Sequence, residues 1–217
     1  MNTKYVLYDE LKIFYKIDKY ETYPPHEDSF LMTEYLGNIV IGKKVLDMGC
    51  GSGIQGIISK KYGSNYITFA DIDRDALVIS KYNYTYNFVD SSVTLNSLKE
   101  YTLENAEFIL TDLFRNINKK YDLILFNPPY LPAAGDEDEK SKLWTAGGKT
   151  GNEIIDNFLS DAYKYLNNNG CILLLVSSLS NPPYILSKYS KLYKFKVVKK
   201  LKLFFEELIL IELFPKF

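Results

Sequence analysis

Hydrophobic residues gather in short runs along the chain, and these runs alternate with segments of helical spacing. The runs, which contain few polar positions, are "KKVLDMG", "YITFADID", "EFILTDLF", "YDLILFNPP" and "CILLLVSS". Continuous apolar strands of this kind are buried on both faces of a sheet. Apolar residues recur every three or four positions in "IQGIISKKYG", "RDALVISKYNYTYN" and "GNEIIDNFLSDAYKYLNNNG", as in helices. The alternation predicts an α/β fold with a mostly parallel sheet and helices on both faces.

Both ends of the chain and one internal segment depart from this alternation. Residues 1–22 predict one or two short strands or an accessory arm, and "DSFLMTEYLGNI" predicts a helix capped by Asp28 or Ser29. The carboxyl-terminal "FKVVKKLKLFFEELILIELF" predicts a strand hairpin. Residues 89–106 exceed the roughly 2 to 6 residues usual between a helix and a strand. We interpret them as an insertion in a single domain of residues 1–217.

Composition limits the class of protein. The 217 residues, of which 47% are hydrophobic, suffice for one domain with its own core. No apolar run reaches about 18 residues, and the amino terminus lacks the pattern of an export signal, so we expect a cytoplasmic protein without a membrane segment. Cys50, Cys171 and the single His26 are too few for a four-ligand zinc site. We expect neither a metal nor a disulfide.

Lysine dominates the positive charge. Of 26 Lys and Arg residues only Arg74 and Arg115 are arginines, and the formal net charge is −1. Because arginine is the main reader of phosphates and guanine edges, this argues against a large nucleic-acid footprint. A general bias toward Lys, Asn, Ile and Tyr would explain the same numbers.

Two ligand-binding patterns overlap in "DMGCGSGIQG". The dinucleotide fingerprint G-x-G-x-x-G is matched by Gly51, Gly53 and Gly56. The loop of S-adenosylmethionine-dependent methyltransferases, D-x-G-x-G-x-G, is matched by Asp47, Gly49, Gly51 and Gly53. In both patterns the glycines let the backbone approach the ligand, and Asp71, about 20 residues later, would accept from ribose hydroxyls. Asp112 and the motif at Asn127, which follow the next two strands, favour the methyltransferase over a dehydrogenase.

The tetrapeptide Asn-Pro-Pro-Tyr occurs twice, beginning at Asn127 and at Asn181. The second copy precedes a segment of helical spacing, so we predict that Asn181 is a helix amino-cap and Pro182 the first helical residue. The first copy directly follows the buried strand "DLILF", at the carboxyl end of the sheet, where open α/β folds bind ligands. We therefore expect the first copy to form the site.

The first copy suits a planar NH2 group as substrate. The prolines that follow Asn127 and Pro128 hold the backbone extended, so the side-chain carbonyl of Asn127 and the main-chain carbonyl of Pro128 can both accept hydrogen bonds from one NH2. Two fixed acceptors orient this poor nucleophile toward a sulfonium methyl and stabilise the positive charge that grows on nitrogen. Tyr130 is predicted to lie against the flat face of the substrate group.

The order of five motifs resembles a known family. "YPPHEDSFLM", "VLDMGCGSG", "DLILFNPPYLP", "WTAGGKTGNEIIDNFL" and "FFEELILIEL" are similar to HemK-type protein glutamine methyltransferases, specifically the short archaeal and eukaryotic release-factor branch. The resemblance implies a seven-stranded, Rossmann-like class I methyltransferase with S-adenosylmethionine as cofactor. Its substrate would be the glutamine amide of the GGQ motif in a class 1 translation release factor. Such enzymes commonly pair with a small zinc-containing activator protein.

The resemblance also implies roles for single residues. The catalytic set is Asn127, Pro128 and Tyr130, and the substrate cleft is shaped by Trp144, Gly147 and Gly148. The predicted cofactor-binding residues are Asp28, Ser29, Asp47, Gly49, Gly51, Gly53, Asp71, Ile72, Asp112, Leu113 and Asn127. His26 stands where the family has a small residue, and we interpret it as a surface histidine. The activator would dock at the sheet edge near the third strand, which we expect the insertion to cover in part with Val93, Leu95, Leu98, Tyr101 and Leu103.

Two other functions stay open. An N-methyltransferase for adenine in RNA or DNA would use the same chemistry, and a non-catalytic cofactor-binding protein would need only the glycine loop. Four acids, from Asp136 to Glu139, lie within about ten residues of Asn127 and would repel a phosphate backbone. The presence of Asn127 with both prolines argues against the non-catalytic protein.

Overall fold

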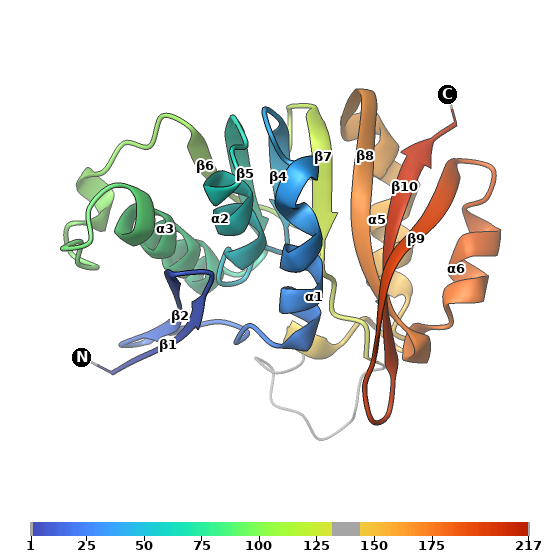
Figure 1. The fold of residues 1–217 in the computed structure, drawn as a ribbon, viewed down its shortest axis with the longest axis horizontal. Helices are drawn as coiled ribbons and strands as arrows, with labels where there is room; N and C mark the ends of the chain where they lie inside the picture. Colours follow the sequence, from blue (N-terminus) through green and yellow to red (C-terminus); the bar gives the residue numbers. More distant parts are fainter. Residues whose placement is uncertain (1, 132–143, 217) are drawn as a thin grey trace. The chain divides into compact units, whose positions relative to one another are not determined.

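The computed structural model describes residues 2–131 and 144–216 (Figure 1). The chain divides into two compact units, Met1–Ile117 and Asn118–Phe217. The acidic stretch from Asp136 to Glu139 lies outside the described residues. No helix in the described part of the chain is long and apolar enough to cross a membrane.

The first unit begins with a three-stranded antiparallel sheet, in the order β1-β2-β3. Its strands are β1 (Thr3–Tyr8), β2 (Leu11–Ile17) and β3 (Tyr20–Glu21). The turn between β1 and β2 consists of Asp9 and Glu10, whose φ angles of 48° and 65° suit a tight hairpin. The loose alternation of residues 1–22 therefore corresponds to three strands rather than one or two.

The rest of the first unit alternates strands and helices. These elements are α1 (Glu27–Leu36), η1 (Gly37–Ile39), β4 (Lys44–Met48), α2 (Ile54–Lys61), β5 (Tyr66–Asp71), α3 (Arg74–Phe88), η2 (Leu98–Glu100) and β6 (Ala106–Leu110). β5 pairs in parallel with both β4 and β6. Helix α1 starts at Glu27 after His26 and has no side-chain cap. The prediction of a cap at Asp28 or Ser29 is wrong, because both residues lie in the first helical turn.

The second unit contains the remaining strands. Its elements are β7 (Tyr121–Phe126), α5 (Glu153–Asp161), η3 (Ala162–Tyr165), β8 (Leu166–Ser177), η4 (Ser178–Ser180), α6 (Pro182–Lys188), β9 (Tyr193–Lys202) and β10 (Glu207–Pro215). β7 and β8 are parallel, whereas β10 is antiparallel to both β8 and β9. The seven strands follow the order β6-β5-β4-β7-β8-β10-β9. The predicted α/β fold, with a seven-stranded and mostly parallel sheet, is confirmed.

One helix is shorter than its sequence pattern predicts. The amphipathic pattern runs to Gly170, but α5 ends at Asp161 and β8 already begins at Leu166. The chain continues from α5 as the 3-10 turn η3, and the three consecutive asparagines that follow lie within β8 rather than in a helix. Asn169 adopts a left-handed φ of 65°, which no helix accommodates.

Candidate functional site

The loop between β4 and α2 is built on glycines with left-handed backbone. Gly49, Gly51 and Gly53 have φ angles of 60°, 53° and 78°, a region that costs side-chain-bearing residues energy. The amide of Gly53 donates to the carbonyl of Cys50 at 2.7 Å, which closes a turn directly before α2. Both loop patterns predicted from the sequence therefore fall on one tight turn at the amino end of a helix.

Gly56 serves packing rather than the turn. A Cβ atom at this position would lie 2.3 Å from Cε1 of Phe69 and 3.1 Å from Oδ2 of Asp47. Helix α2 thus approaches β5 more closely than any larger residue would permit. The third glycine of the dinucleotide fingerprint is explained by this contact, so it carries no information about which cofactor binds.

Two buried carboxylates hold the loop. Oδ2 of Asp47 accepts a hydrogen bond from the Gly56 amide at 2.9 Å. Burial raises the pKa of Asp47 well above its ordinary value; the Gly56 hydrogen bond opposes this effect, and the negative charge of Asp71 adds to it. Asp71 accepts from the amides of Gly51 and Asp73, both at 2.9 Å. Burial raises the pKa of Asp71 to about 6, against the opposing effect of these hydrogen bonds.

The carboxyl ends of β5 and β6 bring together further predicted residues. The amide of Thr111 donates to the carbonyl of Asp71 at 2.8 Å, so Asp112 follows β6 beside the end of β5. Ile72 is 55% exposed next to Asp71, and Asp112 is exposed as well. Leu113 has a left-handed φ of 46°, and the Thr111 hydroxyl donates to its carbonyl at 2.9 Å. This edge displays an acid and an apolar side chain to solvent.

The first turn of α1 places Asp28 and Ser29 in the same unit. Both are buried, and Oδ1 of Asp28 accepts from the Ser29 amide at 2.7 Å. Helix α1 packs against α2, which follows the glycine loop. His26 is exposed, with its ring 5.5 Å from that of Tyr23, in agreement with a surface histidine.

A buried asparagine that the sequence analysis missed supports the loop. Asn83 on α3 donates from Nδ2 to the carbonyls of Phe14, at 2.7 Å, and Ser52, at 2.9 Å. Its Oδ1 accepts from the Phe14 amide at 2.9 Å. One amide side chain therefore links β2 to the glycine loop. The sequence could have indicated this role, because asparagine is disfavoured in the interior of a helix such as "KYNYTYN" unless its side chain makes hydrogen bonds.

The amino-terminal sheet also reaches the loop through Thr22. This residue is buried at 1% exposure, and its Oγ1 would lie 3.5 Å from a Cβ atom at Gly51. Residues 1–22 are thus a supporting part of the loop's surroundings within the first unit.

In the second unit, the first Asn-Pro-Pro-Tyr copy directly follows the last residue of β7. Asn127 and Tyr130 are half-buried and Pro128 is buried. The amide of Leu131 donates to the carbonyl of Thr145 at 2.9 Å. The chain that leaves the motif is therefore bonded to a neighbouring segment of the same unit.

Gly147 fixes this segment from two sides. Its amide donates to the carbonyl of Leu131 at 2.8 Å, and its own carbonyl accepts from the Glu153 amide at 3.1 Å, at the start of α5. A Cβ atom on Gly147 would lie 2.7 Å from the carbonyl oxygen of Pro129. Gly148 has a φ of 104°. Gly147 thus allows close packing against the motif, whereas a Cβ atom on Gly148 would meet the side chain of Glu153 at the start of α5.

The second copy is a helix start, as predicted, but not a hydrogen-bonded cap. Asn181 precedes α6 and Pro182 is its first residue. Asn181 has a left-handed φ of 49°, and its side chain makes no capping hydrogen bond. Asparagine is suited to this position by its tolerance of left-handed backbone, and the predicted capping bond is wrong.

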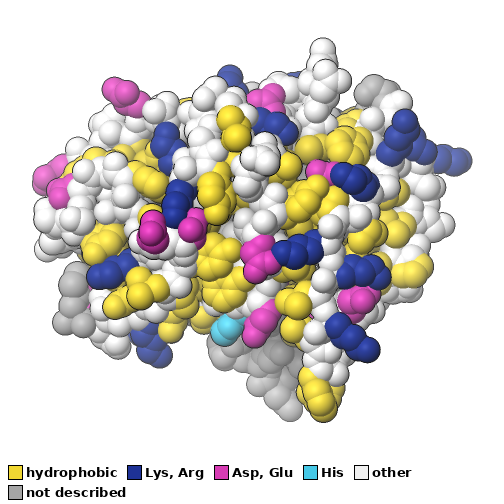
Figure 2. Space-filling view, viewed as in Figure 1, with side chains coloured by type: hydrophobic (Ala, Val, Ile, Leu, Met, Phe, Trp, Pro, Cys, Tyr) yellow, Lys and Arg dark blue, Asp and Glu magenta, His cyan; other side chains and the backbone are white. Residues whose placement is uncertain are grey.

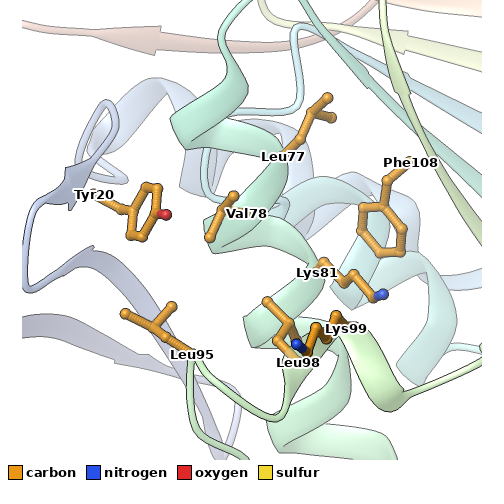
Figure 3. A pocket seen from close by; sticks show the side chains of 8 residues that line it. All are labelled: Tyr20, Leu77, Val78, Lys81, Leu95, Leu98, Lys99 and Phe108. Carbon is orange, nitrogen blue, oxygen red and sulfur yellow. The ribbon is translucent and has the colours of Figure 1, made fainter.

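The insertion packs onto α3 and β2. Val93 and Leu98 are buried in a cluster with Phe14, Ile17 and Tyr82, and Leu95 and Tyr101 lie against it. No β6 residue belongs to this cluster in the part of the chain that the structure describes. Beside the insertion lies a hollow of about 360 Å³, which Figure 3 shows lined by Tyr20, Leu77, Val78, Lys81, Leu95, Leu98, Lys99 and Phe108. Phe108 on β6 contributes one wall of it.

Comparison with known proteins identifies a family. The family described as "Methyltransferase small domain" matches residues 27–204. The "Putative protein N5-glutamine methyltransferase MJ0928" of Methanocaldococcus jannaschii is 37% identical over 194 residues, which cover 88% of this chain and 90% of that protein. Ribosomal RNA small subunit methyltransferase C of Buchnera aphidicola is 28% identical over 172 residues, covering 79% of this chain and 42% of that protein.

A solved structure shares the fold. In the E. cuniculi Mtq2-Trm112 complex, which is responsible for the methylation of the eRF1 translation termination factor, the matching chain is 23% identical with a TM-score of 0.66. The match covers 89% of this chain and 98% of that one. Because the family match extends over most of the sequence and the M. jannaschii relative matches nearly end to end, the chain belongs to the methyltransferase small domain family.

Proposed function

We propose that the protein is an S-adenosylmethionine-dependent methyltransferase that modifies the side-chain amide of the glutamine in the GGQ motif of a class 1 translation release factor. The observation that carries this proposal is the Asn127–Pro128 pair at the carboxyl end of β7, followed by Leu131, which is hydrogen-bonded to Thr145 and Gly147. The names of the M. jannaschii relative and of the E. cuniculi complex support the same substrate class.

The first unit offers the groups that the cofactor requires. Three left-handed glycines expose loop backbone at the start of α2, and Asp71 presents a carboxylate that ribose hydroxyls can share with the loop amides. Ile72 offers an exposed apolar side chain for the flat adenine ring. Asp28, Ser29, Asp47, Asp112 and Leu113 complete the proposed binding set. When bound, S-adenosylmethionine supplies an electrophilic methyl group on a sulfonium.

The second unit offers the groups that the amide requires. The side-chain carbonyl of Asn127 and the main-chain carbonyl of Pro128 accept from the two N–H bonds of the substrate NH2, while Tyr130 lies along its plane. The amide nitrogen forms the new N–C bond, the methyl–sulfur bond breaks, and the nitrogen then loses one proton to water. The two acceptors are most valuable when nitrogen becomes positive, so they lower the barrier without a general base.

We further propose that the two units act as one methyltransferase domain, because the family match at residues 27–204 extends through both. A cytoplasmic location is also part of the proposal, because translation release factors act there. A small activator protein, comparable to the partner in the E. cuniculi complex, is part of the proposal. β6 is the last strand in the sheet order, and such a strand offers unpaired backbone groups to a partner.

Adenine in RNA or DNA is the second candidate substrate, because its exocyclic amine is also a planar NH2 group. The name of the B. aphidicola relative, a ribosomal RNA methyltransferase, supports RNA as a substrate class without specifying the base. Glutamine is favoured by the higher identity, 37%, and nearly full coverage of the N5-glutamine relative.

Two measurements test the proposal. Calorimetry should detect binding of S-adenosylmethionine and no binding of NADH. Labelled cofactor should then transfer its methyl group to purified release factor, but not to a release factor whose GGQ glutamine is replaced by alanine. Equal labelling of both release factors would contradict the assignment of the glutamine.

A further inference from the structure

The hairpin between β9 and β10 ends in two exposed aromatic side chains. Phe204 and Phe205 are 92% and 85% exposed, above every other large hydrophobic residue in the described ranges. Their rings meet edge to face, with centroids 4.6 Å apart and planes at 82°. Figure 2 shows hydrophobic surface at this end of the hairpin, which Figure 1 shows extending beyond the neighbouring strands of the same unit.

The fold does not need these two side chains. They occupy the central positions of a turn closed by a hydrogen bond from the Leu203 amide to the Glu206 carbonyl at 2.8 Å. Neither residue has a left-handed φ, so the turn does not demand glycine or asparagine, but it gives the two phenyl rings no packing role either. Exposed phenyl rings promote aggregation. A local choice that works against solubility is expected at functional positions.

Within the second unit, the turn between β9 and β10 lies at the same end of the strands as the proposed catalytic pair, Asn127 and Pro128. β7 and β8 pair as far as Phe126 and Leu174, and Asn127 is the next residue. β8 ends at Ser177, which pairs with Leu208, the second residue of β10 after the turn. The hairpin tip therefore continues past the carboxyl ends of β7 and β8, on the side where Asn127 emerges.

We propose that Phe204 and Phe205 are a docking point for the folded protein that carries the target glutamine. This inference rests on the proposed function and names the part of the enzyme that recognises the substrate away from the reacting amide. A protruding tip cannot enclose a small molecule, so its partner is a macromolecule with an apolar hollow. Aromatic side chains are enriched at the cores of protein interfaces.

The charges around the tip favour a protein partner over a nucleic acid. Lys200 pairs with Glu207 at 2.8 Å, and Glu206 accepts a hydrogen bond from the Ser177 hydroxyl. Within residues 200–207, two cations, one of them Lys202, stand against two acids. Over the whole hairpin, residues 193–215, five lysines stand against three glutamates, and Lys196 pairs with Glu212. This excess of two charges is small for binding a phosphate backbone, which requires a clustered surplus of positive charge.

The test compares a large and a small substrate. The double variant Phe204→Ser/Phe205→Ser should raise the KM for full-length release factor by about tenfold or more, the effect of losing an interface anchor, with kcat within about twofold. With a short peptide that contains the GGQ motif, KM and kcat should match the wild type. Ile41→Ser is the matched control, because Ile41 is 61% exposed in the loop before β4, at the opposite end of that strand from the glycine loop.

Each alternative gives a different result. Unchanged kinetics of the double variant on full-length release factor would refute docking while leaving the proposed function intact. Loss of turnover on the peptide as well would show a structural effect and also refute docking. A lower affinity for RNA, or a changed oligomeric state, with unchanged release-factor KM would assign the tip to another partner. If the wild type methylates neither the full-length release factor nor the GGQ peptide, the proposed function fails. Even then, binding of release factor to the wild type but not to the double variant would support docking at Phe204 and Phe205.

Discussion

The carboxylate of Asp71 accepts a hydrogen bond from the backbone amide of Gly51 at 2.9 Å. This contact joins the end of β5 to the glycine loop that follows β4. The second oxygen of Asp71 accepts from the amide of Asp73, also at 2.9 Å. Asp71 therefore organises the backbone of the proposed cofactor site, in addition to its proposed role as an acceptor for ribose hydroxyls. Its two roles lead to two separate predictions.

Replacing Asp71 with alanine should weaken S-adenosylmethionine binding by roughly 1.5 to 3 kcal/mol, the cost of losing hydrogen bonds to a charged group. Calorimetry measures this change directly. Glu104→Ala is the control, since Glu104 is an exposed acid of the same unit. Unchanged affinity in the Asp71 variant would exclude this residue from the cofactor site.

The pKa of Asp71 predicts opposite pH effects on stability and on cofactor affinity. Burial raises this pKa to about 6, whereas an aspartate in an unfolded chain titrates near about 3.9. Between these values the folded state holds a proton that the unfolded state has lost, so the contribution of Asp71 to the free energy of unfolding decreases as the pH rises from about 4 to 6. Asp47, whose pKa is also raised, contributes with the same sign.

Denaturation of wild type and Asp71→Asn across this pH range should show a smaller decrease in the variant. Cofactor affinity should instead fall below about pH 6 in the wild type, because only the ionised carboxylate is a full acceptor for ribose hydroxyls. Identical pH slopes in the two proteins would contradict the raised pKa.

The two Asn-Pro-Pro-Tyr copies should respond differently to mutation. Asn127→Ala should abolish turnover and leave folding and most cofactor binding intact, because the proposed task of its side-chain carbonyl is to orient the substrate amide, while the glycine loop and Asp71 supply most of the proposed cofactor contacts. Asn181→Ala should lower the free energy of unfolding by about 1 kcal/mol, because alanine tolerates the left-handed φ of 49° poorly. Asn181→Gly should keep the free energy of unfolding near that of the wild type, because glycine adopts this φ freely. Turnover assays and denaturation of the three variants measure this contrast. Comparable loss of activity at both asparagines would refute the assignment.

The insertion should contribute to the stability of the first unit. Leu98 is 6% exposed in the cluster with Phe14 and Tyr82, so Leu98→Ala should reduce the free energy of unfolding by about 2 to 4 kcal/mol. Lys99→Ala, at the exposed neighbouring position, should change it by less than about 0.5 kcal/mol. Urea denaturation provides the values. Equal effects of the two substitutions would mean that the insertion is not packed as described.

The parts that depend on local chemistry could be predicted from the sequence. The apolar runs indicated the buried strands, and the left-handed turns at Gly49, Gly51 and Gly53 require glycine regardless of the rest of the fold. The position of the first Asn-Pro-Pro-Tyr copy followed from the buried strand before it. These features need only a few neighbouring residues to define them.

The parts that depend on contacts between distant residues could not. Asn83 bonds to Phe14 and Ser52, 69 and 31 residues away in the chain, and no local pattern specifies such partners. The apolar residues of the insertion indicated burial but not the surface they cover. The end of α5 was misplaced because the apolar spacing continues past Asp161, through the 3-10 turn Ala162–Tyr165 and into β8.

The central claim, that the planar amine bound by Asn127 and Pro128 is a glutamine amide, is tested most directly by competition. Purified release factor and total RNA from the same organism are offered together to the wild-type protein with labelled S-adenosylmethionine. Mass spectrometry then locates the label. We expect methylation of the glutamine in the GGQ motif and its loss in Asn127→Ala. Label on an adenine base, with the release-factor glutamine unmodified, would contradict the claim.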